Sequence, residues 1–140
     1  MKVLILCTGN SCRSQMADGF LKYFDQQNRL QVFSAGTEPA KQVNPNAVRV
    51  MLEIGIDISS HQSKSVDLFL GETWDYVITV CGGANESCPA FTGDVKNRLH
   101  IGFDDPWLAR GTDEFVNSEY IRVRDEIGVA FQKFYTEITK

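Results

Sequence analysis

The sequence predicts a single-domain α/β fold: a mostly parallel, four-stranded sheet flanked by helices on both faces. Short apolar runs alternate along the chain with stretches in which apolar residues recur at helical spacing, as they do in successive β-α units. The chain has 140 residues, of which 43% are hydrophobic, enough to fill one core without disulfide bonds. We therefore expect one domain over residues 1–140.

The first half of the chain predicts two strands and two helices. Residues 3–6 form a short apolar run typical of a buried strand, and residues 31–36 predict a second strand. A helix is expected between them, from Ser14 to about Gln27. Asn44 is placed to cap a second helix with Pro45 in its first turn, and Gly55 to end it. The expected apolar stripe of that helix comprises Ala47, Val48, Met51 and Leu52.

The second half predicts two further strands and two further helices. Residues 65–70 favour a short helix, and residues 75–80 form the clearest buried strand, which ends at Cys81. Residues 98–103 predict a strand that leads into Asp104-Asp105-Pro106. Thr112 is placed to cap a long helix that reaches about Ile138.

Three reactive side chains follow three of these predicted strands. Cys7, Cys81 and Asp105 each lie at or just after the carboxyl end of a strand. Ligands of open parallel sheets bind at that edge. The sequence therefore predicts that these residues meet in one crevice.

Composition and charge exclude several classes of function. The net charge is −4, and no cluster of Lys and Arg interrupts the acidic balance, which argues against a nucleic-acid surface. No apolar run approaches the roughly 20 residues of a membrane span, and the amino-terminal run is too short for a signal peptide. We expect a cytoplasmic monomer that binds neither nucleic acid nor membrane, and whose four cysteines are catalytic or metal-binding.

Residues 7–13, Cys-Thr-Gly-Asn-Ser-Cys-Arg, join the first strand to the first helix. Such a loop can surround a tetrahedral oxyanion with backbone N–H groups, and the planar fork of Arg13 can grip two of its oxygens. The same field would lower the pKa of the Cys7 thiol from roughly 8.5, and Ser14 could donate a hydrogen bond to the sulfur. Gly9 is expected where the turn tightens. The predicted oxyanion-binding residues are Thr8, Gly9, Asn10, Ser11, Cys12 and Arg13.

Each of these features also has a purely structural interpretation. Cys7 could be a buried core cysteine and Arg13 a solvated helix residue, although the loop's place between strand and helix favours a site. Asp105 could donate a proton to a leaving oxygen, or Asp104-Asp105-Pro106 could be an ordinary turn.

Cys81 and Cys88 enclose two adjacent glycines, a spacing that suits a disulfide relay. The alternatives are two structural cysteines or half of a zinc site. Zinc is disfavoured because the cysteine spacing lacks the usual tight ligand pairs, and neither His61 nor His100 lies at ligand spacing. We expect both histidines to be hydrogen-bonded structural residues, and we predict no metal and no cofactor.

These motifs together resemble a known family. The loop from Cys7 to Ser14 and the Asp105-Pro106 pair look like the low-molecular-weight protein tyrosine phosphatase fold, and the pair Cys81 and Cys88 looks like its thioredoxin-coupled arsenate reductases. Further matching segments are residues 10–17, 34–36, 43–45, 57–61, 102–106 and 123–127. The resemblance covers nearly the whole chain.

The resemblance implies reduction of arsenate to arsenite in three thiol steps, with phosphate as a competitor. Cys7 attacks arsenate held by Arg13 while Asp105 protonates the leaving oxygen, Cys81 then attacks the Cys7 sulfur, and Cys88 displaces Cys7. Thioredoxin would reduce the resulting disulfide. The alternatives are a phosphatase that hydrolyses aryl phosphates through a Cys7 phosphocysteine, and a non-enzymatic anion-binding or thiol-sensing module.

Three residues fit the reductases less closely. Trp107 follows Asp105-Pro106, where phosphatases of this fold carry aromatic residues that flank an aryl phosphate. Cys12 could close onto Cys7 as a protective disulfide, but we expect a bystander. Some reductases hold potassium beside the loop with an equivalent of Asn10 and nearby acids; Asp18 could serve, but Lys64 stands where another acid is expected. An ammonium group could replace the metal ion here, so the sequence does not predict a potassium requirement.

Overall fold

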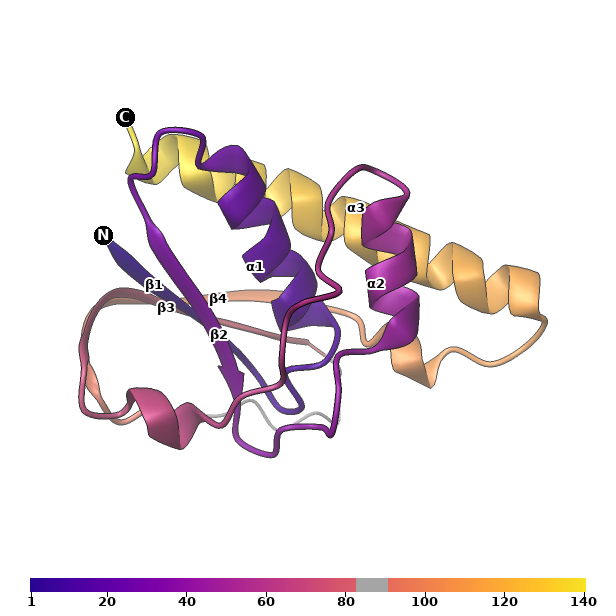
Figure 1. The fold of residues 1–140 in the computed structure, drawn as a ribbon, viewed down its shortest axis with the longest axis horizontal. Helices are drawn as coiled ribbons and strands as arrows, with labels where there is room; N and C mark the ends of the chain where they lie inside the picture. The colour runs from indigo at the N-terminus through magenta and orange to yellow at the C-terminus, as the bar shows by residue number, and fades with distance from the viewer. Residues whose placement is uncertain (83–90) are drawn as a thin grey trace.

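Four parallel strands form the central sheet of the molecule in the computed structural model, which describes residues 1–82 and 91–140. They are β1 (Lys2–Cys7), β2 (Gln31–Gly36), β3 (Thr73–Cys81) and β4 (Asp94–Phe103), in the spatial order β2-β1-β3-β4 (Figure 1). The chain runs from β1 to β2 on one side and then returns to β3 on the other. The strand order therefore reverses between β1 and β3, and ligands of such sheets bind where it reverses. Both of these strands end in a cysteine.

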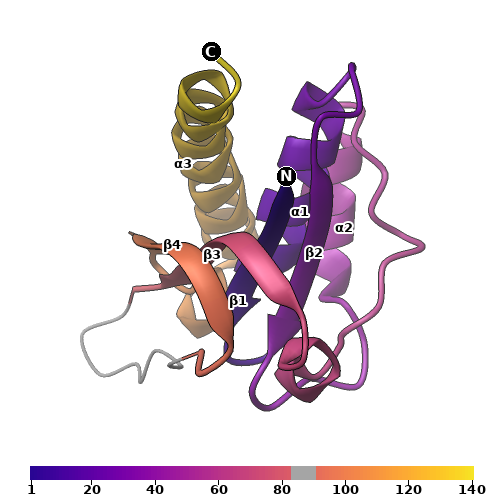
Figure 2. The same ribbon diagram turned by 90° about the vertical axis from the view of Figure 1, so that its left-hand side faces the viewer.

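The alternation of residues in β1 divides the core into two layers. Val3 and Ile5 point to the face covered by α1 (Arg13–Phe24), α2 (Pro45–Leu52) and α3 (Asp113–Ile138). Leu4 and Leu6 point to the opposite face, where they cluster with the 3-10 helix η1 (Val66–Phe69). Figure 2 shows α1 and α3 side by side behind the sheet, with η1 on the other side. Helical elements cover both faces, as the sequence predicts.

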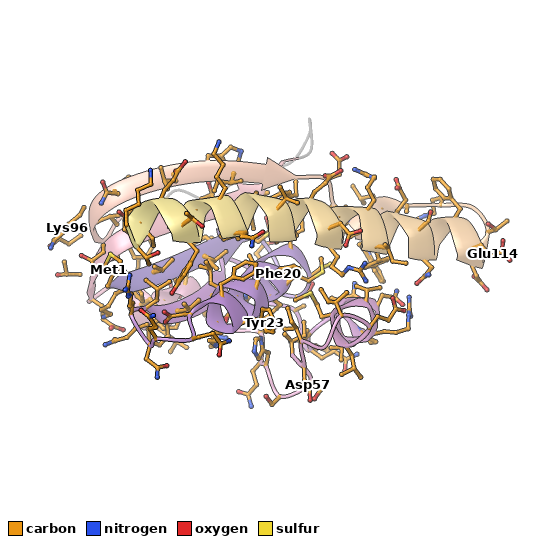
Figure 3. All side chains as sticks on the ribbon, turned by 90° about the horizontal axis from the view of Figure 1, so that it is seen from above. Met1, Phe20, Tyr23, Asp57, Lys96 and Glu114 are labelled. Carbon is orange, nitrogen blue, oxygen red and sulfur yellow. The ribbon has the colours of Figure 1, made fainter. Side chains whose placement is uncertain are left out.

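The two longest helices, α1 and α3, pack closely where Phe20 meets Gly128. Phe20 lies between these helices (Figure 3), and a Cβ at Gly128 would stand 2.9 Å from its ring. A glycine in α3 therefore lets the aromatic ring of α1 approach the helix backbone. This contact fixes α1, whose amino terminus faces the loop after Cys7.

The predicted helix caps are confirmed. The side chain of Asn44 accepts a hydrogen bond from Asn46 N at 2.8 Å at the start of α2, and Thr112 accepts one from Phe115 N at 3.1 Å at the start of α3. Gly55 has φ +84°, the left-handed conformation that ends a helix.

Some predicted boundaries are wrong. Helix α1 ends at Phe24 rather than near Gln27, because the Asp25 carboxylate accepts the backbone N–H groups of Arg29 and Leu30 and turns the chain. Leu52 does not belong to the buried stripe of α2, since 58% of it is exposed. Val50 takes that place, between Ala47 and Met51. The short helix predicted over residues 65–70 is the 3-10 turn η1.

A further short 3-10 helix, η2 (Pro106–Leu108), follows β4 and was not predicted. Within residues 1–82 and 91–140, no helix combines the length and hydropathy needed to cross a bilayer.

Candidate active site

The loop between Cys7 and Arg13 turns its carbonyl groups outward. Each carbonyl of residues 8–12 accepts a hydrogen bond from a group outside the loop. Those with backbone donors are Thr8 (Glu38 N, 2.9 Å), Gly9 (Ala40 N, 2.9 Å), Ser11 (Asn44 N, 2.8 Å) and Cys12 (Met16 N, 2.9 Å). Because the two polar groups of a peptide unit point in opposite directions, outward carbonyls leave inward N–H groups, the arrangement that binds an oxyanion.

Asn10 occupies the centre of this loop in the left-handed conformation, with φ 48°. It is fully buried, and its side chain donates to Ser14 Oγ at 2.9 Å and accepts from Lys64 N at 2.9 Å. Its carbonyl accepts from Ser63 Oγ at 2.9 Å and from Gln15 Nε2 at 3.0 Å. These bonds offset the strain that a non-glycine residue carries at positive φ.

Gln15 and His61 support Asn10, and sequence reasoning missed Gln15. Gln15 Nε2 also donates to Gln62 O at 2.9 Å, and Gln15 Oε1 lies 3.0 Å from His61 Nδ1. Since an amide oxygen only accepts, His61 carries the proton on Nδ1. Burial lowers the pKa of His61, which favours the neutral ring. His61 is thus a hydrogen-bonded structural residue, as expected, and so is His100, whose Nδ1 lies 2.7 Å from Thr79 Oγ1.

The glycine that leaves no space for a side chain beside the loop is Gly36, at the end of β2, rather than Gly9 within the loop. A Cβ at Gly9 would meet only Ser11 Oγ at 3.6 Å, an ordinary contact. A Cβ at Gly36, where β2 ends, would stand 2.4 Å from Thr8 O and 3.0 Å from Asn10 N. The loop therefore requires glycine in the neighbouring strand.

Cys7 and Cys12 are both buried, and neither is in a disulfide bond. Cys7 ends β1 in front of the amino terminus of α1, where helix dipole and loop N–H groups favour an anion. Burial, reinforced by the Asp105 charge, raises the pKa of the Cys12 thiol well above its usual value. Cys12 is therefore an uncharged thiol at neutral pH, whereas Cys7 lies where a thiolate is stabilised.

Arg13 and Asp105 are 92 residues apart in the sequence but lie close together in the fold. The Arg13 guanidinium donates to Phe103 O at 3.0 Å, and its other terminal nitrogen lies 3.6 Å from Asp105 Oδ2. The Arg13 side chain is buried, whereas 25% of the Asp105 side chain is exposed. The other Asp105 oxygen accepts from Trp107 N at 3.1 Å and thereby caps η2. Asp105 is fixed beside the arginine and remains accessible to a ligand.

Cys81 lies at the same edge of the sheet as Cys7. Leu6 pairs with Thr79, so the two cysteines end adjacent parallel strands. Cys81 is buried and disulfide-bonded. Cys88, the other member of the predicted pair, lies outside the described residues.

Asp18, the acid that could hold potassium beside the loop, is buried next to a lysine. Lys22 Nζ lies 2.8 Å from Asp18 Oδ1, and Lys64 also interacts with this carboxylate. Burial lowers the pKa of Lys64, and the Asp18 charge opposes that effect. Lys22 thus places an ammonium group against this acid, whereas Lys64 Nζ donates to Gln62 O at 2.8 Å. Within the described ranges, no three His, Cys, Asp or Glu side chains cluster as metal ligands would.

Trp107 stands on η2 with 63% of its surface exposed, directly after Asp105-Pro106. Leu108 beside it is 65% exposed. Trp107 is therefore not a core residue, and its backbone N–H binds the Asp105 carboxylate.

Comparisons with known proteins agree on the family of the chain. Residues 2–140 match the family model for low molecular weight phosphotyrosine protein phosphatase. The chain is 52% identical over 132 residues to an arsenate reductase of Halalkalibacterium halodurans, covering 94% of this chain and 93% of that protein. It is similar to solved structures of an arsenate reductase in the oxidized state (TM-score 0.77) and another in the phosphate binding state (TM-score 0.75), each 30% identical over 98% of both chains.

Proposed function

Because this chain belongs to the low molecular weight phosphotyrosine protein phosphatase family, we propose that it reduces arsenate to arsenite with the oxyanion loop and a cysteine relay. One observation carries the proposal. A second buried cysteine, Cys81, ends the strand next to the one that ends in Cys7. A hydrolase of this fold needs only the first thiol, whereas reduction of As(V) needs another thiol that can supply the second electron of the pair.

In the first step the Cys7 thiolate attacks arsenic and an arsenic–oxygen bond breaks. Loop N–H groups and Arg13 stabilise the charge that spreads over the remaining oxygens. Asp105, held beside Arg13 and partly exposed, donates its proton to the departing oxygen. The product of this step is a thioester of As(V) on Cys7, with the leaving oxygen released as water.

In the second step the Cys81 thiolate attacks the Cys7 sulfur. A sulfur–sulfur bond forms, the sulfur–arsenic bond breaks, and its electron pair stays on arsenic, which leaves as arsenite. Cys88 then attacks the Cys81 sulfur and releases the Cys7 thiolate. Two thiols have been oxidised and one As(V) reduced, so the electrons balance.

The resulting disulfide must be reduced before another turnover. A dithiol protein of the thioredoxin class supplies these two electrons, and Cys81 and Cys88 regain their thiols. In the structure Cys81 is disulfide-bonded and Cys7 is not, which is consistent with the state that awaits this reductant.

The test couples arsenate to NADPH oxidation through thioredoxin reductase and thioredoxin. We expect arsenate-dependent turnover in the wild-type protein, and its loss in Cys7→Ser, Cys81→Ser and Cys88→Ser. Cys12→Ser is the matched control and should retain turnover, because Cys12 is a neutral buried thiol. Turnover that survives in both Cys81→Ser and Cys88→Ser would exclude the relay.

The second candidate function is hydrolysis of aryl phosphates, favoured by the exposed Trp107 next to Asp105. A flat ring at the mouth of the site can stack on an aryl group. Hydrolysis would need Cys7, Arg13 and Asp105 but neither Cys81 nor Cys88. Comparing 4-nitrophenyl phosphate hydrolysis with arsenate reduction in Cys88→Ser separates the two functions, since only hydrolysis should remain.

A further inference from the structure

The paired ends of β3 and β4 are irregular beside the oxyanion loop. Thr79 pairs with His100, but Cys81 pairs with Phe103, so β4 has one residue more than β3 over this step. A bulge of this kind changes the direction of the residues that follow it. Those residues are Phe103 and Asp105, which both contact Arg13.

Two glycines permit the close approach of the strand ends. A Cβ at Gly82, directly after Cys81, would lie 2.7 Å from Phe103 N and 2.9 Å from Phe103 O. A Cβ at Gly102 would lie 2.9 Å from His100 Nε2, 3.1 Å from Cys81 O and 3.2 Å from Gly82 Cα. Neither glycine has a positive φ. Gly82 therefore needs glycine for space because the backbone of Phe103 lies against it, and Gly102 because the His100 ring and the backbone of Cys81 lie against it.

The main chain of Phe103 is shared by two parts of the site. On one side it lies against Gly82. On the other its carbonyl accepts a hydrogen bond from Arg13 at 3.0 Å. Arg13 is 5% exposed, so this carbonyl limits how its rigid guanidinium can turn. A displacement of Gly82 would move Phe103 and, with it, the nitrogens that Arg13 offers to an oxyanion.

We propose that the Gly82–Gly102 contact positions Arg13 through the Phe103 carbonyl, and so couples the redox state of Cys81 to oxyanion binding in the Cys7 loop. The inference rests on the proposed oxyanion site but does not depend on arsenate being the substrate. A coupling between two sites is reciprocal. If the state of Cys81 alters the affinity for an oxyanion, a bound oxyanion alters the stability of the Cys81 disulfide by the same factor.

The first experiment uses Gly102→Ala, which inserts a methyl group between the strand ends. Hydrolysis of 4-nitrophenyl phosphate and its inhibition by inorganic phosphate report oxyanion binding. We expect KM and the phosphate inhibition constant to rise at least about tenfold, because a misdirected arginine loses its paired hydrogen bonds. Alkylation of Cys7 by iodoacetamide should keep its rate and pH profile, because other segments hold the loop carbonyls.

Gly71→Ala is the matched control, since a Cβ at Gly71 would meet no atom within 4 Å. It should leave both constants unchanged. A merely structural role of Gly102 would reduce the amount of active protein and hence the apparent kcat, with KM unchanged. An unchanged KM and phosphate inhibition constant in folded Gly102→Ala protein would overturn the proposal.

The second experiment uses the wild-type protein, and it decides the question if Gly102→Ala fails to fold. The protein is equilibrated in buffers of reduced and oxidised dithiothreitol, with saturating phosphate or with chloride at equal ionic strength, and Cys81 is assayed by thiol labelling. In the disulfide form Arg13 is hydrogen-bonded to Phe103 O and the loop carbonyls point outward. Because this arrangement suits an oxyanion, we expect phosphate to favour the disulfide form.

A tenfold coupling would make the midpoint potential more negative by about 30 mV. An unchanged potential, or a shift of opposite sign, would overturn the coupling. Arsenate turnover is measured separately, so a protein without reductase activity could still show the shift, and an active reductase could lack it.

Discussion

Gly36 is the single residue on which the geometry of the oxyanion loop depends most directly. A methyl group there would overlap the carbonyl of Thr8, which cannot move without releasing its bond to Glu38. We predict that Gly36→Ala lowers kcat/KM for 4-nitrophenyl phosphate by about 100-fold or more, because small displacements of positioning groups have large effects on rate. Steady-state kinetics on folded protein measure this loss. A variant within threefold of the wild type would show that the loop tolerates the displacement.

The hydrogen bonds of Asp25 lead us to predict that this residue makes a pH-dependent contribution to the free energy of unfolding. Burial would raise its pKa, but the N–H groups of Leu30 and Arg29 and the hydroxyl of Tyr135 together lower it. A carboxylate whose pKa is lowered by folding stabilises the protein above its unfolded pKa, and this stabilisation is lost as the pH falls through the folded value. We therefore predict that Asp25→Asn is less stable than the wild type by about 1–3 kcal/mol at pH 7.

The difference between Asp25→Asn and the wild type should shrink as the pH falls below about 4, because the unfolded chain then binds a proton that the folded carboxylate, with its lowered pKa, binds only at lower pH. Urea unfolding at several pH values measures it. A difference that stays constant down to pH 3 would mean that the carboxylate charge is not what these hydrogen bonds stabilise.

Residue types and spacing predicted the reacting groups but not the residues that support them. Cys7 and Arg13 belong to one short segment, so their spacing alone predicts an oxyanion-binding loop. Asn10 is held by Ser63 and Lys64, which lie more than 50 residues away. Ser63 binds its backbone carbonyl and Lys64 its side-chain amide, and no sequence pattern predicts these hydrogen bonds. Gln15 lies within the first helix, where the sequence does not distinguish it from other polar residues. Its hydrogen bond to His61 depends on the tertiary structure.

Among the elements, α2 offers a separable test, because Asn44 has three different contacts. Its side-chain oxygen caps the helix, its amide nitrogen donates to Tyr120 Oη at 2.9 Å, and its backbone N–H donates to Ser11 O. We predict that Asn44→Ala lowers the free energy of unfolding by about 1–2 kcal/mol through loss of the cap. Asn44→Asp keeps a capping oxygen and should lose less.

Phosphate inhibition should change less than threefold in both Asn44 variants, since the backbone donor to Ser11 is retained. Urea unfolding and inhibition of 4-nitrophenyl phosphate hydrolysis provide the two measurements. If Asn44→Asp were as unstable as Asn44→Ala, the bond to Tyr120, rather than the cap, would be the main contribution.

Sequence patterns predicted the helix starts and the ends of α2 and α3 better than the end of α1. Asn44 and Thr112 satisfy local N–H groups within three residues, so the capping pattern is visible in the sequence. The end of α1 depends on Asp25, which binds the chain that follows and the distant Tyr135. The exposure of Leu52 depends on which side of α2 meets α3, and helical periodicity alone does not fix that side.

For the whole molecule, alternating strands and helices were sufficient to predict a parallel sheet with reactive residues at its carboxyl edge. The order β2-β1-β3-β4 was not predicted, and it is what brings Cys7 and Cys81 onto adjacent strands. The bulge at the end of β4 was also not predicted, because it depends on pairing with β3.

The stability of the whole molecule should report oxyanion binding, because a ligand that binds only the folded state stabilises it by mass action. Phosphate at 100 times its dissociation constant would add about 2.7 kcal/mol, a rise in Tm of roughly 10 °C for a chain of this size. Thermal unfolding with increasing phosphate, against chloride at equal ionic strength, measures the shift. Arg13→Ala should unfold earlier without ligand, since Phe103 O and Asp105 lose their partner. Its phosphate-induced shift should fall below a third of the wild-type shift, and an equal shift would mean that phosphate stabilises the protein at another place.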